Sequence, residues 1–532
     1  MTGLVEVEVR VRTRTKGHQI KSIIRRSQER AMAASRFQEL SNKVVLGNQL
    51  ESTTPLEPSG QFTQVEQSEE ATPHQESWEG IIQAGVNESI IEENPEETEP
   101  ESGQSEKSEP DEEEEDELAP VYIEGGIVAY GNISADGKNV LLKPQIVLPV
   151  KPRKPVFRIY NSDKNFWPIF KSLWKKGWDG GPGEGNMLRA SMIFSRGTVP
   201  FLLKGKQMLN SIGLSGCIGG AKNMQLECRR KLASHHGCKY ESLKIQPAQF
   251  NMDSTKVCSE FFEIANLEEN AAKQWLYKPV NAFHGRGIKL YNGPSELWKK
   301  LGGCKGKHAA IVMEYISRPA TVQGGYKFDL RSYLLVGSLD PQLVFYADGF
   351  ARKSDTVYNA TDKRTTVHIT NSVNQKKENH FLNFTDTGKF LELEMKFGPG
   401  FLDRAREYMK KTSVFLFKTT DTQAKKLRRF PGRFHLFAID WIIDADGSIH
   451  LLEGNGYPLV TEYPIQGLTP TIWRDMVDLV LKIHVTPDEL SKKFTVKQKF
   501  TYGKWSLIYN ELEEQLAVAN GQPKYNPCTI FP

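Results

Sequence analysis

The chain has 532 residues, of which 39% are hydrophobic, and its formal net charge at pH 7 is only +4. The small total hides an uneven distribution, because residues 1–50 carry ten lysines and arginines against four acids and residues 51–150 carry three against twenty-five, which leaves a net charge of +20 on residues 151–532. No apolar run approaches the roughly 18 residues that span a bilayer, and no signal-peptide core follows the N-terminus, so the sequence argues against a membrane-spanning or secreted protein.

The first 150 residues lack the composition of a globular domain. We expect residues 1–50 to form a flexible basic arm. Residues 51–150 are rich in Glu, Ser, Pro, Gln and Thr and include the acidic run Asp111–Glu117. Such a segment cannot bury enough apolar surface to offset the conformational entropy lost on folding, so we predict that it is disordered. The basic body beyond it implies an acidic partner: nucleic acid, an anionic membrane or an acidic protein surface.

From residue 151 onward, strand-like and helix-like segments alternate. Runs of β-type residues bounded by Gly, Pro or Asn predict strands, and apolar residues at helical spacing predict helices. The predicted strands are 155–160, 189–194, 275–279, 288–290, 309–316 and 332–336; the predicted helices are 166–174, 222–233 and 470–490, with an apolar and basic connection at 200–210. We therefore predict a layered α/β body with mostly antiparallel sheets.

Six cysteines occur in the chain, none of them in a C-x-x-C pair. Cys228 and Cys238 lie near His235 and His236, which raises the alternative of a zinc site, but the spacing matches no standard zinc finger. We expect reduced thiols instead, as in proteins of the cytosol.

Three oxygen-bearing side chains come together if one hairpin forms as the sequence predicts. Residues 434–443 and 448–452 have the pattern of two strands joined by the acidic turn Asp444–Gly447. Asp440 would then lie opposite Glu453 and Asn455, which share a face because side chains two apart on a strand point the same way. Such hard oxygen donors suit Mg²⁺ that holds ATP phosphates. A solvated hairpin face is the alternative, but unpaired acids inside buried strands are costly.

Basic residues recur beside glycines near the ends of predicted strands. Lys278 follows an apolar run and precedes the loop Gly285–Arg286–Gly287–Ile288, where glycine would let backbone N–H groups approach phosphate oxygens. The run Met313–Glu314–Tyr315–Ile316 could present its backbone edge to an adenine base, and an ordinary core strand explains this run equally well.

More charged residues follow on later strands. Lys327, Asp329 and Arg331 alternate with apolar residues, which predicts a strand with one charged face, on which Asp329 could simply pair with Arg331. Arg352 ends another apolar strand, and His368–Ile369–Thr370–Asn371 supplies polar groups for a substrate. Taken together, these residues predict a site for a polyanion.

The order of these motifs resembles that of a known family. A protein kinase is excluded because Asp348–Gly349–Phe350 has the wrong order for the kinase metal motif and no His-Arg-Asp occurs; a Walker lysine motif is also absent. Over residues 155–485 the chain instead resembles the tubulin tyrosine ligase-like family. The motifs that carry the resemblance are Lys278–Pro279, Gly285–Ile288, Lys327–Arg331, Gly349–Arg352, His368–Asn371 and Leu452–Asn455.

The resemblance implies an ATP-grasp fold of the α/β (α+β) class, in which ATP lies between two antiparallel sheets. The implied domains are an N-terminal α/β domain at 151–250, a central ATP-grasp domain at 251–335, a C-terminal ATP-grasp domain at 336–490 and a tail at 491–532. The same resemblance implies ATP contacts of two kinds: phosphate contacts from Lys222, Lys278, Gly285, Arg286, Gly287 and Ile288, and an adenine hinge formed by Met313, Glu314, Tyr315 and Ile316. It implies that the phosphate and the reacting carboxylates are surrounded by Lys327, Arg331 and Arg352, and that the substrate is held by His368, Thr370 and Asn371. The implied Mg²⁺ ligands are Asp440, Glu453 and Asn455.

The implied activity is ATP-dependent ligation of a free amino acid to carboxylates of acidic tubulin tails, with ATP and Mg²⁺ as cofactors. The segments Gln207–Asn210 and Gly219–Gly220 favour glycine as the added residue, with glutamate next and tyrosine after it; a catalytically silent tubulin-binding protein is the rival from another class. We expect tubulin or microtubules as partners, no nucleic acid and no membrane, and a location in the cytoplasm on the cytoskeleton, including the cilium or axoneme. The Glu-rich segment 92–117 mimics an acidic tail and is a candidate occupant of the basic groove.

Overall fold

A computed structural model of the protein describes residues 130–531, except residues 152, 161–165, 183–188, 196–206, 213–214, 283–284, 307, 372–373, 376–379, 422–428, 459, 461–464 and 466–467. The basic arm at 1–50, the acidic region up to residue 129 and most of the connection at 200–210 are predictions that lie outside the described residues. Residues 130–150, which the sequence assigned to the disordered region, instead contain an antiparallel hairpin of β1 (Gly131–Ile133) and β2 (Val140–Leu142). The prediction was wrong there because this stretch does bury apolar side chains, Val140 and Leu142 among them.

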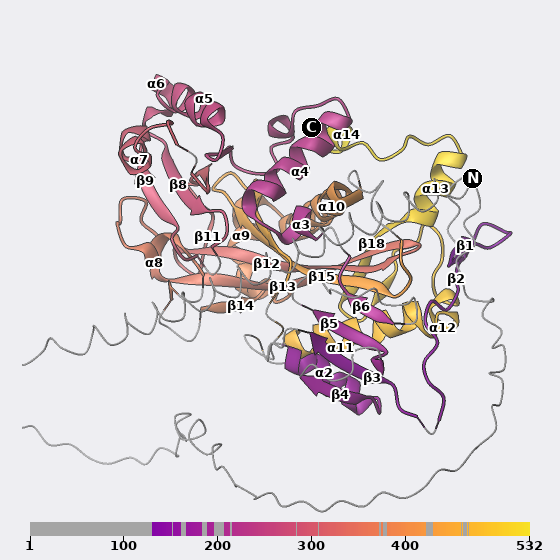
Figure 1. The fold of residues 1–532 in the computed structure, drawn as a ribbon. Helices are drawn as coiled ribbons and strands as arrows, with labels where there is room; N and C mark the ends of the chain where they lie inside the picture. The colour runs from indigo at the N-terminus through magenta and orange to yellow at the C-terminus, as the bar shows by residue number, and fades with distance from the viewer. Residues whose placement is uncertain are drawn as a thin grey trace, which may run out of the picture. The chain divides into compact units, whose positions relative to one another are not determined.

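A large mixed sheet forms the centre of the described fold (Figure 1). Its strands follow the order β17 (Thr501–Tyr502), β18 (Trp505–Asn510), β13 (Gln342–Val357), β12 (Tyr326–Leu339), β15 (Arg433–Ile443), β6 (Met208–Asn210), β5 (Met192–Ser195), β3 (Val156–Tyr160) and β4 (Asp179–Pro182), while β11 (Thr321–Val322), β14 (Phe381–Asn383) and β16 (Ile449–Asn455) pair with β12, β13 and β15. Pairing is antiparallel from β17 to β15 and parallel from β15 to β4. The mixed α/β fold is thus confirmed, and a parallel section joins its antiparallel part.

Both faces of the large sheet are buried because its long strands send alternate side chains to opposite sides. On β12, Tyr333 and Leu335 belong to one apolar core and Leu334 and Val336 belong to another. Helices cover both faces: α2 (Trp167–Lys175) and α11 (Leu468–His484) contribute to the first core, and α4 (Lys222–His235) and α10 (Phe401–Asp421) to the second. Figure 1 shows α4 and α10 on the opposite side of the sheet from α11.

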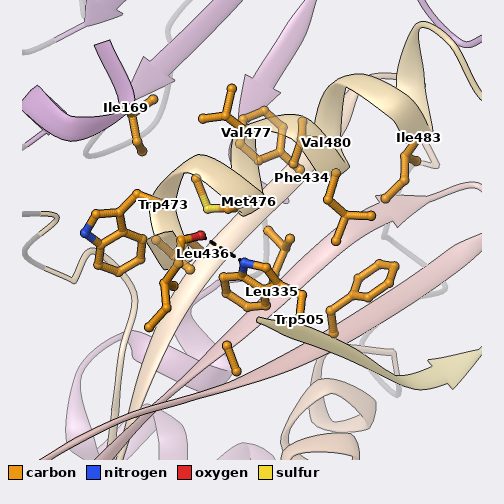
Figure 2. Close-up of a cluster of buried hydrophobic side chains, with 14 of the residues drawn as sticks. Ile169, Leu335, Phe434, Leu436, Trp473, Met476, Val477, Val480, Ile483 and Trp505 are labelled. Carbon is orange, nitrogen blue, oxygen red and sulfur yellow. Dashed lines mark hydrogen bonds between the residues drawn. The ribbon is translucent and has the colours of Figure 1, made fainter. Parts of the chain in front are cut away.

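Helix α11 illustrates why the sequence folds this way. Its residues Ile472, Met476, Leu479, Val480 and Ile483 recur at helical spacing and are almost fully buried, which confirms the predicted closing helix. Figure 2 shows this stripe packed against side chains of the sheet and of α2, and the indole of Trp505 donates a hydrogen bond of 3.0 Å to the carbonyl of Ile472. The interaction fixes β18 beneath α11, so the segment after residue 491, which was predicted as a tail, contributes strands to the large sheet.

A second, four-stranded antiparallel sheet has the order β7 (Gln249–Asn251), β10 (Ala310–Glu314), β8 (Gln274–Pro279) and β9 (Lys289–Asn292). One face packs on α5 (Thr255–Ala265) and α7 (Pro294–Leu301) through a core that contains Phe261, Trp275, Leu297 and Val312. The other face carries Leu276 and Met313, which pack with Tyr315 and Ile369. This alternation leaves the second face available to form a cleft.

Shorter elements complete the described fold. They are α3 (Gly216–Gly219), α6 (Glu268–Ala271), α8 (Thr365–His368), α9 (Leu391–Phe397), α12 (Asp488–Ser491), α13 (Glu511–Ala519), α14 (Pro527–Ile530) and the 3₁₀ turns at Tyr240–Leu243 and Thr387–Phe390. In the described part of the chain, no helix has both the length and the apolar character needed to cross a membrane.

The cysteines differ from the expectation of reduced thiols, which the structure contradicts. All six form disulfides, namely Cys217–Cys228, Cys238–Cys528 and Cys258–Cys304, with Cα–Cα distances of 5.5, 5.9 and 5.6 Å. The partners are 11 to 290 residues apart in sequence, so tertiary folding brings them together. The pairing also removes Cys228 and Cys238 as zinc ligands, and among the described residues no three His, Cys, Asp or Glu side chains are grouped as metal ligands would be.

Candidate active site

A cleft with about 640 Å³ of empty space lies between the four-stranded sheet and the large sheet. Its walls combine apolar and charged side chains: Leu276, Lys278, Ile288, Met313, Tyr315, Ile316, Lys327, Asp329, Arg352, His368, Ile369, Thr370, Asn371, Asp440, Ile442, Leu452 and Glu453. Twelve of these were predicted as site residues from the sequence, and residues from both sheets contribute.

The four-stranded sheet contributes Lys278 as a direct result of strand alternation. Lys278 lies two residues after Leu276 on β8, so both face the cleft, and the strand register pairs Leu276 with Met313 on β10. The Lys278 ammonium lies 3.5 Å from the sulfur of Met313 and is 7% exposed. Burial lowers the pKa of Lys278 to about 8, although the charge of Glu453 opposes this effect.

The large sheet contributes a buried cluster of two arginines and two aspartates. The register places Asp329 beside Arg352 and Arg331 beside Asp440, and each arginine binds its carboxylate with two nitrogens. Arg352 also reaches Asp440 at 3.1 Å. The suggested Asp329–Arg331 pair is therefore wrong, because adjacent same-face positions on one strand are farther apart than cross-strand partners.

The charge state of Asp440 follows from these contacts. Burial alone would raise the pKa of Asp440, but the charges of Arg331 and Arg352 outweigh it and lower the pKa to about 2. Asp440 is thus ionised at neutral pH, with only 1% of its surface exposed.

A hydrogen-bonded chain of Lys327, Tyr315 and His368 forms another wall. The Lys327 ammonium donates to the Tyr315 hydroxyl at 2.9 Å, and this hydroxyl lies 2.8 Å from Nδ1 of His368, whose Nε2 contacts the carbonyl of Asp362. Burial lowers the pKa of His368, so the ring is neutral at pH 7; with Nε2 donating to Asp362, Nδ1 accepts from Tyr315. Burial lowers the pKa of Lys327 to about 7, with Asp329 opposing the shift.

The hairpin of β15 and β16 forms as the sequence predicts, with Asp440 opposite Glu453 in the register. Asn455 lies beside Asp440, with its side-chain nitrogen 3.3 Å from Oδ2. Oδ1 of Asp440 accepts a single hydrogen bond, from Arg331, so it keeps a lone pair, and the Glu453 carboxylate lines the cleft 3.8 Å from Lys222. Two carboxylates and an amide in this arrangement fit a hard divalent cation chemically, and their assignment as Mg²⁺ ligands stays a prediction.

Two glycine contacts hold β16 at the floor of the site. A Cβ atom on Gly454, between Glu453 and Asn455, would overlap the carbonyl oxygen of Ile218, and one on Gly219 would overlap the backbone of Gly456. Helix α3 and β16 therefore approach each other backbone to backbone. This packing accounts for Gly219 without any role in choosing an amino acid, although its segment had favoured glycine as the added residue.

The loop after Lys278 also needs its glycines. Gly285 and Gly287 have φ angles of +73° and +71°, and a Cβ on Gly285 would lie 3.0 Å from the side-chain oxygen of Asn371. The loop thus lies against the predicted substrate block, and Ile288 at its end lines the cleft, while Arg286 is exposed.

Comparison with known proteins identifies the family. Residues 205–493, more than half of the chain, match the model of the tubulin-tyrosine ligase family. The chain belongs to this family. The earlier resemblance is thereby confirmed, and the described mixed α/β structure is consistent with the ATP-grasp fold of the family.

Relatives within the family carry different names. The chain is 24% identical to protein polyglycylase TTLL10 of Rattus norvegicus, over 44% of this chain and 38% of that protein, and 25% identical to the probable alpha-tubulin polyglutamylase Ttll1 of Tetrahymena thermophila, over 47% and 65%. It is 29% identical to the inactive polyglycylase TTLL10 of Homo sapiens, over 39% and 35%. The chain thus spans less than two thirds of the length of each of these relatives.

Some predicted site residues do not line the main cleft. Arg331 binds Asp440 at 2.8 Å, Asn455 lies beside Asp440, and Glu314 pairs with Lys273 at 3.0 Å. Lys222 lines a smaller neighbouring cavity. The sequence analysis assigned site roles to these residues from the order of the motifs, and motif order gives no information on the direction of a side chain.

Sequence reasoning assigned no site role to five residues that line the cleft. Leu276, Asp329, Ile369, Ile442 and Leu452 all flank motif residues on strands or in the substrate block. Strand alternation could have placed Leu276 and Ile442 in the cleft, because each lies two positions from a predicted site residue and therefore points to the same face.

Proposed function

We propose that this member of the tubulin-tyrosine ligase family is an ATP-dependent ligase that joins a free amino acid to carboxylates of acidic tubulin tails. The observation that carries the proposal is the cleft between two sheets, where buried cations from both sheets face a pair of acids. Lys278 enters from the small sheet, and Lys327, Arg352, Asp440 and Glu453 enter from the large one. Such a set suits a reaction that brings several anions together.

ATP would contact both the apolar and the charged side chains that line the cleft. The apolar side chains of Leu276, Met313, Ile316 and Ile442 offer surfaces on which an adenine ring can pack. Lys278 and the loop around Gly285 would contact the phosphates, as positively charged and backbone N–H donors. Burial makes the contact of Lys278 strong because little water screens this side chain.

The first chemical step would form an acyl phosphate. A carboxylate oxygen of the acceptor attacks the γ-phosphorus of ATP, the bond from phosphorus to the bridging oxygen breaks, and ADP leaves with the electron pair. Lys278 and Lys327 would offset the charge of the two approaching anions, which otherwise repel each other, and Arg352, already paired with Asp329 and Asp440, would orient these carboxylates. Arg331 would act as a positioning residue, because it holds Asp440 with two hydrogen bonds of 2.8 Å.

The second step would form the amide bond. The amine of the free amino acid, after losing a proton, attacks the acyl carbon; the bond from carbon to the phosphate oxygen breaks, and inorganic phosphate leaves with the electron pair. A Mg²⁺ ion, when bound by Asp440, Glu453 and Asn455, would supply charge neutralisation for the phosphates. Thr370 and Asn371 would hold the substrate, while His368, whose two ring nitrogens already bond to Tyr315 and Asp362, would position the Tyr315 hydroxyl.

The proposal also names the acceptor, an acidic tubulin tail, and the amino acid that is added to it. Residues 151–532 carry a net charge of +20, which complements an acidic tail, and the Tetrahymena relative is named for alpha-tubulin. Glycine stays our first prediction and glutamate the second; relatives named polyglycylase and polyglutamylase both match this chain, which supports these two candidates without ranking them.

Mass spectrometry tests the proposal directly. Tubulin is incubated with the full chain, ATP, Mg²⁺ and one amino acid at a time: glycine, glutamate or tyrosine. The expected result is a series of added residues of one kind on acidic tail peptides, absent when ATP is omitted. Tubulin that gains no mass, from protein that still binds microtubules, would support the rival of a silent tubulin-binding protein, which the name of the human relative makes worth testing.

A further inference from the structure

A second, smaller cavity opens beside the main cleft and shares three of its wall residues. It has about 240 Å³ of empty space and is lined by Lys222, Gln225, Arg229, Gln249, Lys278, Ile311, Leu452 and Glu453. Lys278, Leu452 and Glu453 also line the main cleft. A ligand in the smaller cavity would therefore reach the place where the phosphates and the acceptor are expected to meet.

Arg229, on helix α4, is the unusual member of this cavity. Only 2% of its surface is exposed, and its guanidinium donates to two neutral amide oxygens, those of Gln246 at 2.6 Å and Gln225 at 2.8 Å. No carboxylate among the described residues lies within ion-pairing distance, and its Nε has no hydrogen-bond partner. Burial lowers the pKa of Arg229, which expresses the cost of keeping this charge inside the fold; Tyr240 and the charge of Glu453 oppose the shift without forming an ion pair.

The contrast with the other buried arginines is direct. Arg331 and Arg352 each bind aspartate with two nitrogens, so their charges are balanced within the chain. Arg229 is held equally well in place but has no such partner. A buried, positioned cation that the protein does not neutralise is suited to an anion from outside.

The surrounding charges agree with an anionic ligand. Three cations, Lys222, Arg229 and Lys278, line the cavity against one carboxylate, that of Glu453, which Lys222 approaches at 3.8 Å. The site also lies close to the reacting centre: Gln225, which accepts from Arg229, accepts a hydrogen bond from the backbone nitrogen of Gly454 at 3.2 Å. Gly454 separates Glu453 from Asn455.

We propose that this cavity binds the α-carboxylate of the free amino acid, with Arg229 as its ionic partner. The amine then extends toward the wall shared with the main cleft, where the acyl phosphate forms. The inference rests on the proposed ligase function and adds to it the site of the second substrate. ATP is a poorer occupant because Arg229 does not line the larger cleft, where the nucleotide is expected.

The test compares each amino acid with the same molecule lacking its carboxylate charge. Glycinamide and the α-amide of glutamate keep the attacking amine, so they isolate what the carboxylate contributes. The rates of addition to a fixed acidic tail peptide are measured for the unchanged protein, Arg229→Gln and Arg229→Lys. Lys231→Gln is the matched control, because it removes one positive charge from the same helix at an exposed residue that pairs with Glu227.

We expect the unchanged protein and Lys231→Gln to prefer the amino acid over its amide by about tenfold or more, as a charge-assisted hydrogen bond would give. In Arg229→Gln the KM for the amino acid should rise by about the same factor, the rate with the amide should stay unchanged, and the preference should disappear. Arg229→Lys, which keeps the charge and is the safer variant for folding, should retain part of the preference.

Three outcomes would overturn the assignment. Equal losses with amino acid and amide would give Arg229 a purely structural role, and a rise in the KM of the acceptor peptide alone would assign the anion to the acceptor. An unchanged KM for the amino acid would exclude Arg229 altogether. If the unchanged protein ligates nothing, the ligase proposal fails by itself, and ligand-observed NMR with glycine and glycinamide in the presence of ADP and Mg²⁺ still decides whether Arg229 binds a carboxylate.

Discussion

Asp440 offers the sharpest test of the site, because its charge is balanced entirely by neighbours inside the fold. We consider Asp440→Asn, which keeps the shape of the side chain and removes the charge. The folded protein lowers the pKa of Asp440 from 3.8 to about 2, and one pKa unit corresponds to about 1.4 kcal/mol. The ionised carboxylate thus contributes on the order of 2 kcal/mol to the free energy of unfolding at pH 7.

This value lies below the 3–5 kcal/mol typical for breaking a buried ion pair. The smaller figure is reasonable because Arg352 keeps Asp329 as a partner, and the side chain of Arg331 is 17% exposed and can draw on water. Because the folded pKa is lowered, the contribution is complete above pH 4 and is lost as the pH falls through 2. The difference between the unchanged protein and Asp440→Asn should therefore shrink across that window.

Denaturant unfolding followed by tryptophan fluorescence measures this effect, since Trp441 is fully buried beside Asp440. Asp446→Asn is the matched control on the same hairpin, where the aspartate forms an exposed pair with Arg318 at 3.5 Å, and it should change stability by less than about 0.5 kcal/mol. The reasoning is refuted if Asp440→Asn is no more destabilising than the control. It is also refuted if the difference between the two proteins persists unchanged below pH 3.

Other perturbations address the remaining parts of the site. Glu453→Gln should lower the rate of ligation by about a hundredfold or more and leave the affinity for the tail peptide unchanged, because it removes a proposed metal ligand and no docking cation. The control Glu260→Gln on α5 should change neither the rate nor the affinity. Equal activity of the two variants would dismiss the metal assignment. Gly454→Ala should destabilise the protein by more than about 2 kcal/mol in thermal unfolding, because its Cβ overlaps the backbone of α3, while Gly306→Ala has open space and should be neutral. ATP binding at pH 8 should take up protons, because phosphate restores the charge of Lys327, whose pKa is about 7 in the free protein. Calorimetry in buffers of different ionisation enthalpy measures this uptake. Lys327→Met should take up fewer protons, and equal uptake would contradict the placement of Lys327 beside the phosphates.

Where the chemistry depends on local strand geometry, the sequence was sufficient. The turn Asp444–Gly447 and the alternation on both strands predicted that Asp440 would face Glu453, and the register confirms it. The closing helix at α11 was equally predictable, because its apolar stripe has only one way to be buried. The long helix α10 escaped prediction. Phe401, Ala405 and Met409 do recur at helical spacing and are buried, so the signal was present in the sequence and was not used.

The charge partners could not be assigned in the same way. Nothing within the block from Lys327 to Arg331 reports that Asp329 pairs with Arg352, since that contact depends on the register between β12 and β13. The acidic segment 92–117 and its suggested place in a basic groove lie outside the described residues. The cysteine pairs show the same limit, because Cys238 and Cys528 are 290 residues apart.

The sequence by itself therefore determined part of the secondary structure, the family and the identity of most groups in the cleft. Patterns repeated every two or 3.6 residues are local and can be read along the chain. The tertiary structure decided which of these groups face each other, that Arg331 binds Asp440, and that Arg229 is buried without an ion pair. Such facts depend on distances between strands and helices that are far apart in the chain, and only packing sets those distances.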